Sequence, residues 1–203
     1  MNRSAGQSRA PVAPAPAGEP ARASTVALVA RQPIYGPAMT VLGYELLYQE
    51  PGAQEPAAAV SARDAAVKVV ADAALEIGLD RLAGGLPVYI QYPRELLLTD
   101  SPISLHPERV VIECVEDIPC GPELLEAIGA LQARGHRIAL DDYSPRLNDP
   151  ALLAKVDIVK IDVSQQTPAE LARYVPKLVQ RGLTLIAEEV ATVEQFEQGV
   201  QLG

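Results

Sequence analysis

Short apolar runs rich in β-branched residues alternate with stretches of helical periodicity from Thr25 to the end of this 203-residue chain. Runs of this kind, bounded by turn residues, are typical of buried strands. Seven strands are expected, at residues 26–31, 41–48, 86–91, 109–114, 137–141, 157–162 and 183–188. Helices are expected at residues 61–77, 122–134, 168–181 and 192–202. Strands that alternate with helices pair in parallel, so the pattern predicts an α/β fold with a mainly parallel sheet.

The first two strands are an exception, because the short loop between them contains Tyr35, Gly36 and Pro37. A loop of this length joins antiparallel strands as a hairpin. For the rest of the sheet, alternation leaves two architectures open, an open doubly wound sheet and a closed (β/α)8 barrel.

Polar side chains, most of them acidic, lie within the second strand and at or just after the ends of the later ones. They are Glu45, Gln91, Glu113, Asp141, Asp142, Lys160, Asp162, Glu188 and Glu189. In a (β/α)8 barrel all parallel strands end on one face, where active sites lie, so these side chains would converge. An open sheet would spread them along a wide edge. The pattern therefore favours the barrel.

Seven of these side chains are carboxylates, and Lys160 is the only cation among them. Like charges at close range cannot all ionise without compensation. Mg²⁺, Mn²⁺ and Ca²⁺ take oxygen ligands and would supply that compensation. One carboxylate of the Asp141-Asp142 pair could bridge two ions, as in two-metal phosphodiester cleavage. We favour a site for Glu45, Glu113 and Asp141, and solvated loop or edge positions for Asp162 and Glu189.

Charge and composition exclude several function classes. Lys and Arg number 17 against 26 Asp and Glu, so the net charge is −9 and no nucleic acid polymer is expected as a partner. No apolar run approaches the roughly 20 residues that cross a bilayer, and no secretory signal begins the chain, so we expect no membrane contact and a cytoplasmic location. Cys114 and Cys120 have no histidine at zinc-ligand spacing and are expected to be ordinary thiols.

Residues 1–24 are rich in alanine and proline and contain no aromatic side chain. Such a segment cannot bury enough apolar surface to offset the entropy of ordering it. We therefore expect a disordered tail at residues 1–24 and a single domain at residues 25–203.

Five ordered motifs resemble those of the EAL-domain phosphodiesterases of cyclic di-GMP. Glu45 to Gln49 lies where that family has Glu-x-Leu-x-Arg, and Glu113 lies where it has its next metal glutamate. The other three are Leu140-Asp141-Asp142-Tyr143, resembling Asp-Asp-Phe; Val159-Lys160-Ile161-Asp162, resembling Lys-Ile-Asp; and Ala187-Glu188-Glu189-Val190, resembling Ala-Glu-Gly-Val-Glu. The segment from Ala30 to Gln49 also resembles the subclass in which an EAL-like half precedes an HDOD domain.

The resemblance implies a TIM-like (β/α)8 barrel of EAL type with an antiparallel first strand. It implies that Glu45, Glu113 and Asp141 ligate one metal ion, Mg²⁺ or Mn²⁺, and that Asp142 and Asp162 serve a second. By the same resemblance Lys160 positions the attacking water and Glu188 is the general base.

Several departures from the family pattern argue against catalysis. Gln91 replaces an asparagine ligand and is one methylene longer, which displaces the ligand oxygen. Gln49 replaces the arginine that holds a substrate phosphate, so a bidentate cationic contact is lost. Residues 143–147 replace a Gly-Thr-Gly loop, and Glu189 and Ala191 replace a glycine and a glutamate of the last motif. Phosphoryl transfer depends on positioning and electrostatics, so these losses together predict an inactive domain with weak metal binding.

The family's eighth strand would begin just after Leu202-Gly203, so the closing strand is expected to be missing. An open barrel exposes strand edges, and exposed edges pair with other chains. We expect self-association through that edge or a partner that fills the gap, unless the chain is a fragment of a longer protein.

The leading expectation is a catalytically inactive EAL-like regulatory or scaffolding domain in cyclic di-GMP signalling. It would act through a signalling protein partner or a C-terminal HDOD-like domain, and would bind cyclic di-GMP with low affinity if at all. A weak metal-dependent cyclic di-GMP phosphodiesterase is the alternative, and an unrelated barrel enzyme stays open because a fold does not fix a function.

Overall fold

A computed structural model describes residues 28–49, 78–98, 106–114, 120–145 and 149–203 of the chain. The predicted tail at residues 1–24 and the predicted helix at 61–77 lie outside these residues. So do the first two residues of the strand predicted at 26–31.

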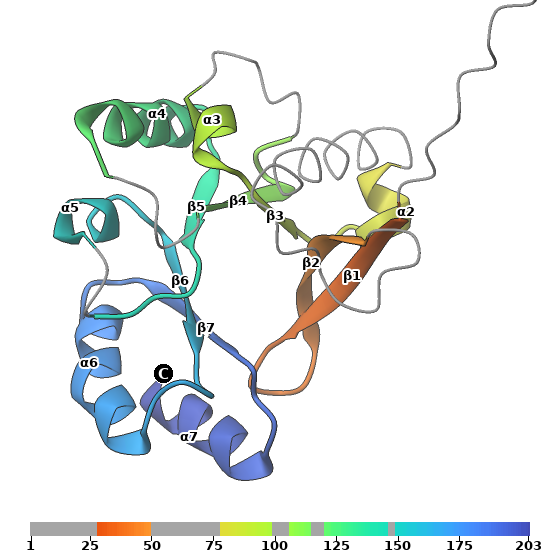
Figure 1. Ribbon diagram of the computed structural model, residues 1–203. Helices are drawn as coiled ribbons and strands as arrows, with labels where there is room; N and C mark the ends of the chain where they lie inside the picture. The colour runs from red at the N-terminus through yellow and green to blue at the C-terminus, as the bar shows by residue number, and fades with distance from the viewer. Residues whose placement is uncertain (1–27, 50–77, 99–105, 115–119, 146–148) are drawn as a thin grey trace, which may run out of the picture.

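Seven strands form one sheet in the order β1-β2-β3-β4-β5-β6-β7 (Figure 1). The strands are β1 Leu28–Tyr35, β2 Val41–Gln49, β3 Val88–Gln91, β4 Val110–Cys114, β5 Arg137–Leu140, β6 Ile158–Asp162 and β7 Thr184–Glu188. β1 and β2 are antiparallel, with Gln32 opposite Glu45, and every later neighbour pairs in parallel. This pairing confirms the predicted hairpin and the predicted mainly parallel sheet. All seven strands also lie within a few residues of their expected positions.

Each described helix follows a strand. The helices are α2 Leu79–Ala83, α3 Arg94–Leu97, α4 Pro122–Ala133, α5 Pro150–Leu153, α6 Pro168–Gln180 and α7 Val193–Leu202. α4, α5 and α6 lie along one side of β4 to β7, whereas α2 lies near β1 (Figure 1). Three of the helices begin with proline at the first helical position, where the missing N–H is not needed. Thr167 and Thr192 cap α6 and α7 with reciprocal bonds to Glu170 and Gln195. The helices expected at 122–134, 168–181 and 192–202 are confirmed, and α2, α3 and α5 were missed.

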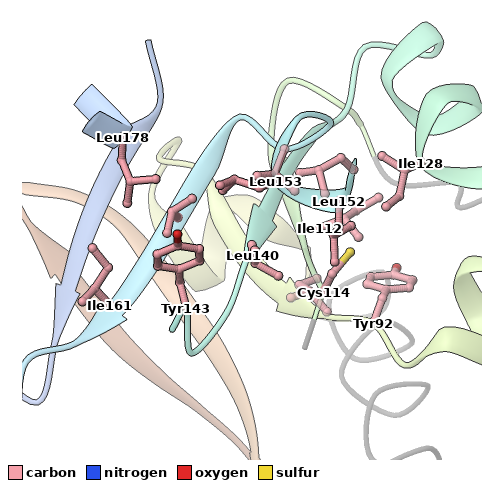
Figure 2. Packing of buried hydrophobic residues seen from close by; sticks show 14 of the residues in the cluster. Tyr92, Ile112, Cys114, Ile128, Leu140, Tyr143, Leu152, Leu153, Ile161 and Leu178 are labelled. Atoms are coloured by element: carbon pink, nitrogen blue, oxygen red, sulfur yellow. The ribbon is translucent and has the colours of Figure 1, made fainter. Parts of the chain in front are cut away.

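The main core lies between the outer face of the sheet and these helices. Ile112 and Leu140 from the strands belong to this core, together with Ile128 of α4 at one end of the cluster and Leu178 of α6 at the other (Figure 2). These side chains are almost fully removed from water. Burial of apolar area stabilises the folded state by about 25 cal/mol per Å², so this layer contributes to folding.

A smaller apolar cluster lies on the opposite, inner face of the sheet. Tyr89, Val111, Ala139 and Ile158 form it, and Ile34 of β1 and Ile186 of β7 pack against it. Because the two outer strands reach the same inner cluster, the sheet curls toward closure, as the predicted barrel requires. In the described part of the chain the curl has seven strands, so β1 and β7 are its edges, and the fold is a TIM-like barrel of EAL type that lacks a closing strand.

Gly43 on β2 makes room for the inner cluster. A Cβ atom at this position would lie 3.0 Å from the Pro87 carbonyl oxygen and 3.1 Å from Cε2 of Tyr89. Tyr44 donates a backbone hydrogen bond to that same carbonyl. Glycine therefore allows β2 to pair closely with β3 while the Tyr89 ring fills the floor of the barrel.

No described helix is both long enough and apolar enough to cross a bilayer.

Leu178→Ala should lower the free energy of unfolding by about 2 to 5 kcal/mol, because it leaves a cavity in the main core. Its neighbour Val179 lies on the same helix and is 41% exposed. Val179→Ala is the matched control and should change stability by less than about 1 kcal/mol. Urea unfolding of both variants tests this, and equal losses would show that α6 does not pack as described.

Candidate functional site

The inner face of the sheet carries a charged layer directly above the apolar cluster. Glu45 lies on β2, Glu113 on β4, Lys160 on β6 and Glu188 on β7, and Asp141 follows the last residue of β5. The parallel strands of this layer point the same way, so side chains at their carboxyl ends meet at one mouth. The convergence expected from the sequence is present in the structure.

Lys160 lies at the centre of this layer. Its Nζ is 2.7 Å from Glu188 Oε1, 2.9 Å from Asp141 Oδ1, and 3.1 Å from both Glu45 Oε2 and Glu113 Oε1. Lys160 is 1% exposed and Glu113 is fully buried. One ammonium group therefore joins four carboxylates from four different parts of the sheet.

An ammonium group has three protons, so it cannot donate to all four carboxylates with good geometry. Lys160 donates to Glu45 Oε2. Among the described residues, both oxygens of Glu113 and Oδ1 of Asp141 are buried without a hydrogen-bond partner, although two of them lie within ion-pair distance of Lys160. The site has more negative charge than the donors around it satisfy.

This surplus of charge changes the acid–base properties of the layer. Burial lowers the pKa of Lys160, but Glu113, Asp141, Glu45 and Glu188 together raise it above its ordinary value, so Lys160 stays charged. Burial raises the pKa of Glu113 well above its ordinary value, and the attraction of Lys160 offsets only part of that rise. Burial also raises the pKa of Glu188 to about 7 against the opposing effect of Lys160.

Gln91 at the end of β3 joins the layer through a neutral contact. Its side-chain Nε2 donates to Oδ2 of Asp141 at 3.2 Å. Gln91 therefore lies at the mouth, and its role in ligand binding stays a prediction. The backbone of Gln49 ends β2, but its side chain is outside the described part of the structure.

Asp142 and Asp162 lie beside the Lys160 layer. Asp142 has a φ of 50°, a left-handed conformation that is uncommon outside glycine, and it turns the chain after β5. Carboxylate oxygens of Asp141, Asp142 and Glu188 lie within 4.8 Å of one another. Asp162 Oδ1 instead accepts a hydrogen bond from the Ser164 backbone at 2.7 Å, and Glu189 is exposed. Asp162 is the half-buried last residue of β6 and Glu189 follows β7, so the solvated loop or edge interpretation of these two residues stays a prediction.

A cavity of about 300 Å³ opens next to Asp142 and Asp162. Tyr143 and Tyr174 form one wall, with ring centroids 5.8 Å apart, and the Tyr174 hydroxyl donates to Gln166 at 2.6 Å. Sequence reasoning missed this wall. The helical spacing of Leu171, Tyr174 and Leu178 predicts that Tyr174 is buried, but no sequence pattern pairs it with Tyr143.

The residues of the mouth fit a hard divalent cation. Three buried carboxylate oxygens of Glu113 and Asp141 have no hydrogen-bond partner among the described residues, and Asp142 and Glu188 place further carboxylate oxygens beside Asp141. Oxygen donors of this kind are the ligands that Mg²⁺, Mn²⁺ and Ca²⁺ prefer.

Comparison with known proteins supports the fold. No family model matches the chain. It is 35% identical over 180 residues to the uncharacterized protein YuxH of Bacillus subtilis, a match over 86% of this chain and 44% of YuxH. It is 30% identical over 179 residues to the cyclic di-GMP phosphodiesterase CdgJ of Vibrio cholerae, a match over 86% of this chain and 41% of CdgJ. The chain thus spans less than half the length of these relatives.

Comparison with solved structures shows which proteins share the fold of this chain. BlrP1 of Klebsiella pneumoniae, in a complex with manganese and cyclic di-GMP, has a TM-score of 0.72 at 24% identity, over 89% of this chain and 54% of BlrP1. The Bacillus subtilis protein YkuI, which has an EAL domain and was solved with cyclic di-GMP and calcium, has a TM-score of 0.66 at 19% identity, over 87% of this chain and 51% of YkuI. The EAL-like fold expected from the motifs is confirmed.

Glu188→Gln should make the stability of the metal-free protein less dependent on pH. The pKa of Glu188 is about 7 in the folded state and about 4.5 ordinarily, so between these values the folded state holds the extra proton. Stability therefore falls as pH rises through this window, and the variant lacks that share of the fall. Urea unfolding in EDTA at several pH values measures it. Glu197→Gln changes an exposed carboxylate and should leave the wild-type slope; an unchanged slope for Glu188→Gln would contradict the assignment.

Proposed function

We propose that this EAL-like domain works in cyclic di-GMP signalling as a regulatory or scaffolding module that does not hydrolyse the nucleotide. The names of CdgJ and BlrP1 connect two similar proteins with cyclic di-GMP. This chain has the acidic layer and its lysine. At several positions where the family pattern has residues that bind substrate or ligate the metal, it has other residues.

The hydrogen bond from Gln91 to Asp141 is the observation that carries the proposal. It directs an N–H group at one of the two oxygens of Asp141, a carboxylate that we propose as a metal ligand. An amide donor and a cation compete for the same lone pairs, so this contact weakens the metal site. The bulky Tyr143 and Pro145 after Asp142 act in the same direction, because they replace a flexible glycine loop with a fixed wall.

Glu45, Glu113 and Asp141 would hold one divalent cation, and Asp142 with Asp162 would serve a second. A bound Mg²⁺ or Mn²⁺ would supply positive charge that stabilises a phosphate and the water beside it. The protein's own part is to hold four carboxylates together through Lys160 and to exclude water from below with the apolar inner cluster. Asp162 is a weak candidate for a ligand, because its carboxylate already caps the backbone of Ser164.

A weak phosphodiesterase is the second candidate, and the Lys160–Glu188 contact at 2.7 Å favours it. Burial raises the pKa of Glu188 to about 7, and a base with a pKa near the working pH transfers protons efficiently. Lys160 would then hold the water that Glu188 deprotonates.

The proposed interaction with another protein rests on the exposed edges of the sheet. β7 is only partly covered and, within the described chain, has a strand neighbour on one side. Exposed strand edges favour pairing with another backbone. A signalling protein, an HDOD-like domain or a second copy of this chain would satisfy them.

Purified protein incubated with cyclic di-GMP and Mn²⁺ or Mg²⁺ should give no linear product in excess of a metal-free blank. The physical reason is the loss of ligand geometry at Gln91 and of the cationic contact at Gln49. Chromatography of the nucleotides measures it. Steady turnover that Glu188→Gln abolishes would establish the weak phosphodiesterase instead, because contaminating activity would not depend on that residue.

One Mn²⁺ ion should bind weakly to the metal-free protein, and Asp141→Asn should weaken it further, by at least about tenfold. Asp141 is the carboxylate shared by the Lys160 layer and by the Asp142–Glu188 group. Calorimetric titration measures both affinities, with Glu197→Gln as the control for loss of a remote charge. Equal binding by wild type and Asp141→Asn would remove Asp141 from the ligand set.

A further inference from the structure

Gln91 and Asp141 belong to strands that are not neighbours. Gln91 ends β3 and Asp141 follows β5, and β4 lies between them with Glu113 opposite Gln91. Strands two places apart are separated by about 9 to 10 Å across the sheet. The hydrogen bond at 3.2 Å therefore crosses β4 at the level of Glu113.

The length of the side chain matters for this contact. Glutamine has one methylene more than asparagine. The side chains of Gln91 and Asp141 both extend across β4, and the hydrogen bond joins them there. A shorter amide on the same backbone would fall short of Asp141 Oδ2 by about the length of one C–C bond, which exceeds the tolerance of a hydrogen bond.

The chemistry fixes the orientation of the amide. Asp141 Oδ2 is an acceptor, so the Gln91 NH₂ group must face it, since the carbonyl oxygen in that place would set two acceptors against each other. Gln91 thus presents donor hydrogens, rather than a ligand oxygen, to the carboxylate layer.

Donors are scarce in this layer. Lys160 has three protons for four carboxylates, and among the described residues both oxygens of Glu113 lack a hydrogen-bond partner, although Oε1 lies within ion-pair distance of Lys160. A buried carboxylate without donors destabilises the fold. Each additional donor at the mouth is therefore worth more than a surface hydrogen bond.

We infer that Gln91 is a positioning residue that takes the place of a cation, holding Asp141 toward Lys160 in the metal-free protein and competing with divalent metal for Oδ2 of Asp141. This deepens the proposed function, since it rests on the weak cation site assigned to Glu113 and Asp141. Metal entry then requires the Gln91 hydrogen bond to break, and this bond contributes to the stability of the metal-free domain.

Gln91→Met removes the amide donor and keeps the length and volume of the side chain. Mn²⁺ should then bind about tenfold more tightly, which corresponds to about 1.4 kcal/mol, the order of one hydrogen bond to a charged group. In EDTA the same variant should unfold at lower urea concentration than wild type, because Asp141 loses its donor. Calorimetry with Mn²⁺ and urea unfolding of metal-free protein measure the two effects.

Gln132→Met is the matched control. Gln132 of α4 also donates its amide to an aspartate, Asp157 Oδ2 at 3.3 Å, far from the mouth. Its loss should lower stability in EDTA and leave the Mn²⁺ affinity unchanged. A residue with a merely structural role would lower stability without tightening metal binding, so opposite signs in the two measurements identify the competition.

Gln91→Leu provides a second route if Gln91→Met folds poorly, because it also removes the amide donor and adds no oxygen ligand. It should also tighten Mn²⁺ binding. Mn²⁺ affinity that is equal to or weaker than wild type in both variants would overturn the inference and leave the inactive function standing. Turnover of cyclic di-GMP by wild type would overturn the inactive function, but the metal titration, which contains no nucleotide, would still decide the role of Gln91.

Discussion

The ammonium group of Lys160 is buried, and the arrangement of the sheet around it follows from that burial. A buried charge is tolerated only with close partners, and Lys160 has four. One of them, Glu45, is on β2, four places away from β6 in the sheet. In a flat sheet that separation would be about 19 Å. The observed contact at 3.1 Å requires the sheet to curl, so the ion pair and the barrel shape depend on each other.

The apolar cluster below the charged layer strengthens every interaction above it. Val111, Ala139 and Ile158 are almost fully buried and close the floor of the curl. Charges that are shielded from water attract and repel more strongly than charges at a surface. The same floor therefore strengthens the hold of Lys160 on its carboxylates and raises the cost of the carboxylate oxygens that lack donors. Any ligand of this mouth must bring positive charge or hydrogen-bond donors.

Sequence patterns located the long elements and the mouth, but not the contacts within it. The strands could be predicted because runs of apolar β-branched residues are recognisable in the sequence. The helices α2, α3 and α5 have four or five residues each, which are too few to show a helical period. The ends of parallel strands could be predicted to converge. That Lys160 meets four carboxylates at once, and that Gln91 reaches over β4, depends on the curl of the sheet and on side-chain rotamers. The hydrogen bond that Asp162 accepts from the Ser164 backbone depends instead on the local turn and on the rotamer of Asp162.

The retention of so many acidic residues does not require that the domain is an enzyme. Removal of one partner from a buried charge pair typically costs about 3 to 5 kcal/mol, because the other charge is left uncompensated. That is a large part of a total stability of about 5 to 15 kcal/mol. Once Lys160 is buried, folding stability requires at least one of its four carboxylate partners, whether or not a metal binds. Gln91 is under a weaker constraint, because it is neutral and its loss removes one hydrogen bond rather than the partner of a buried charge, so the identity of this residue says more about the use of the site.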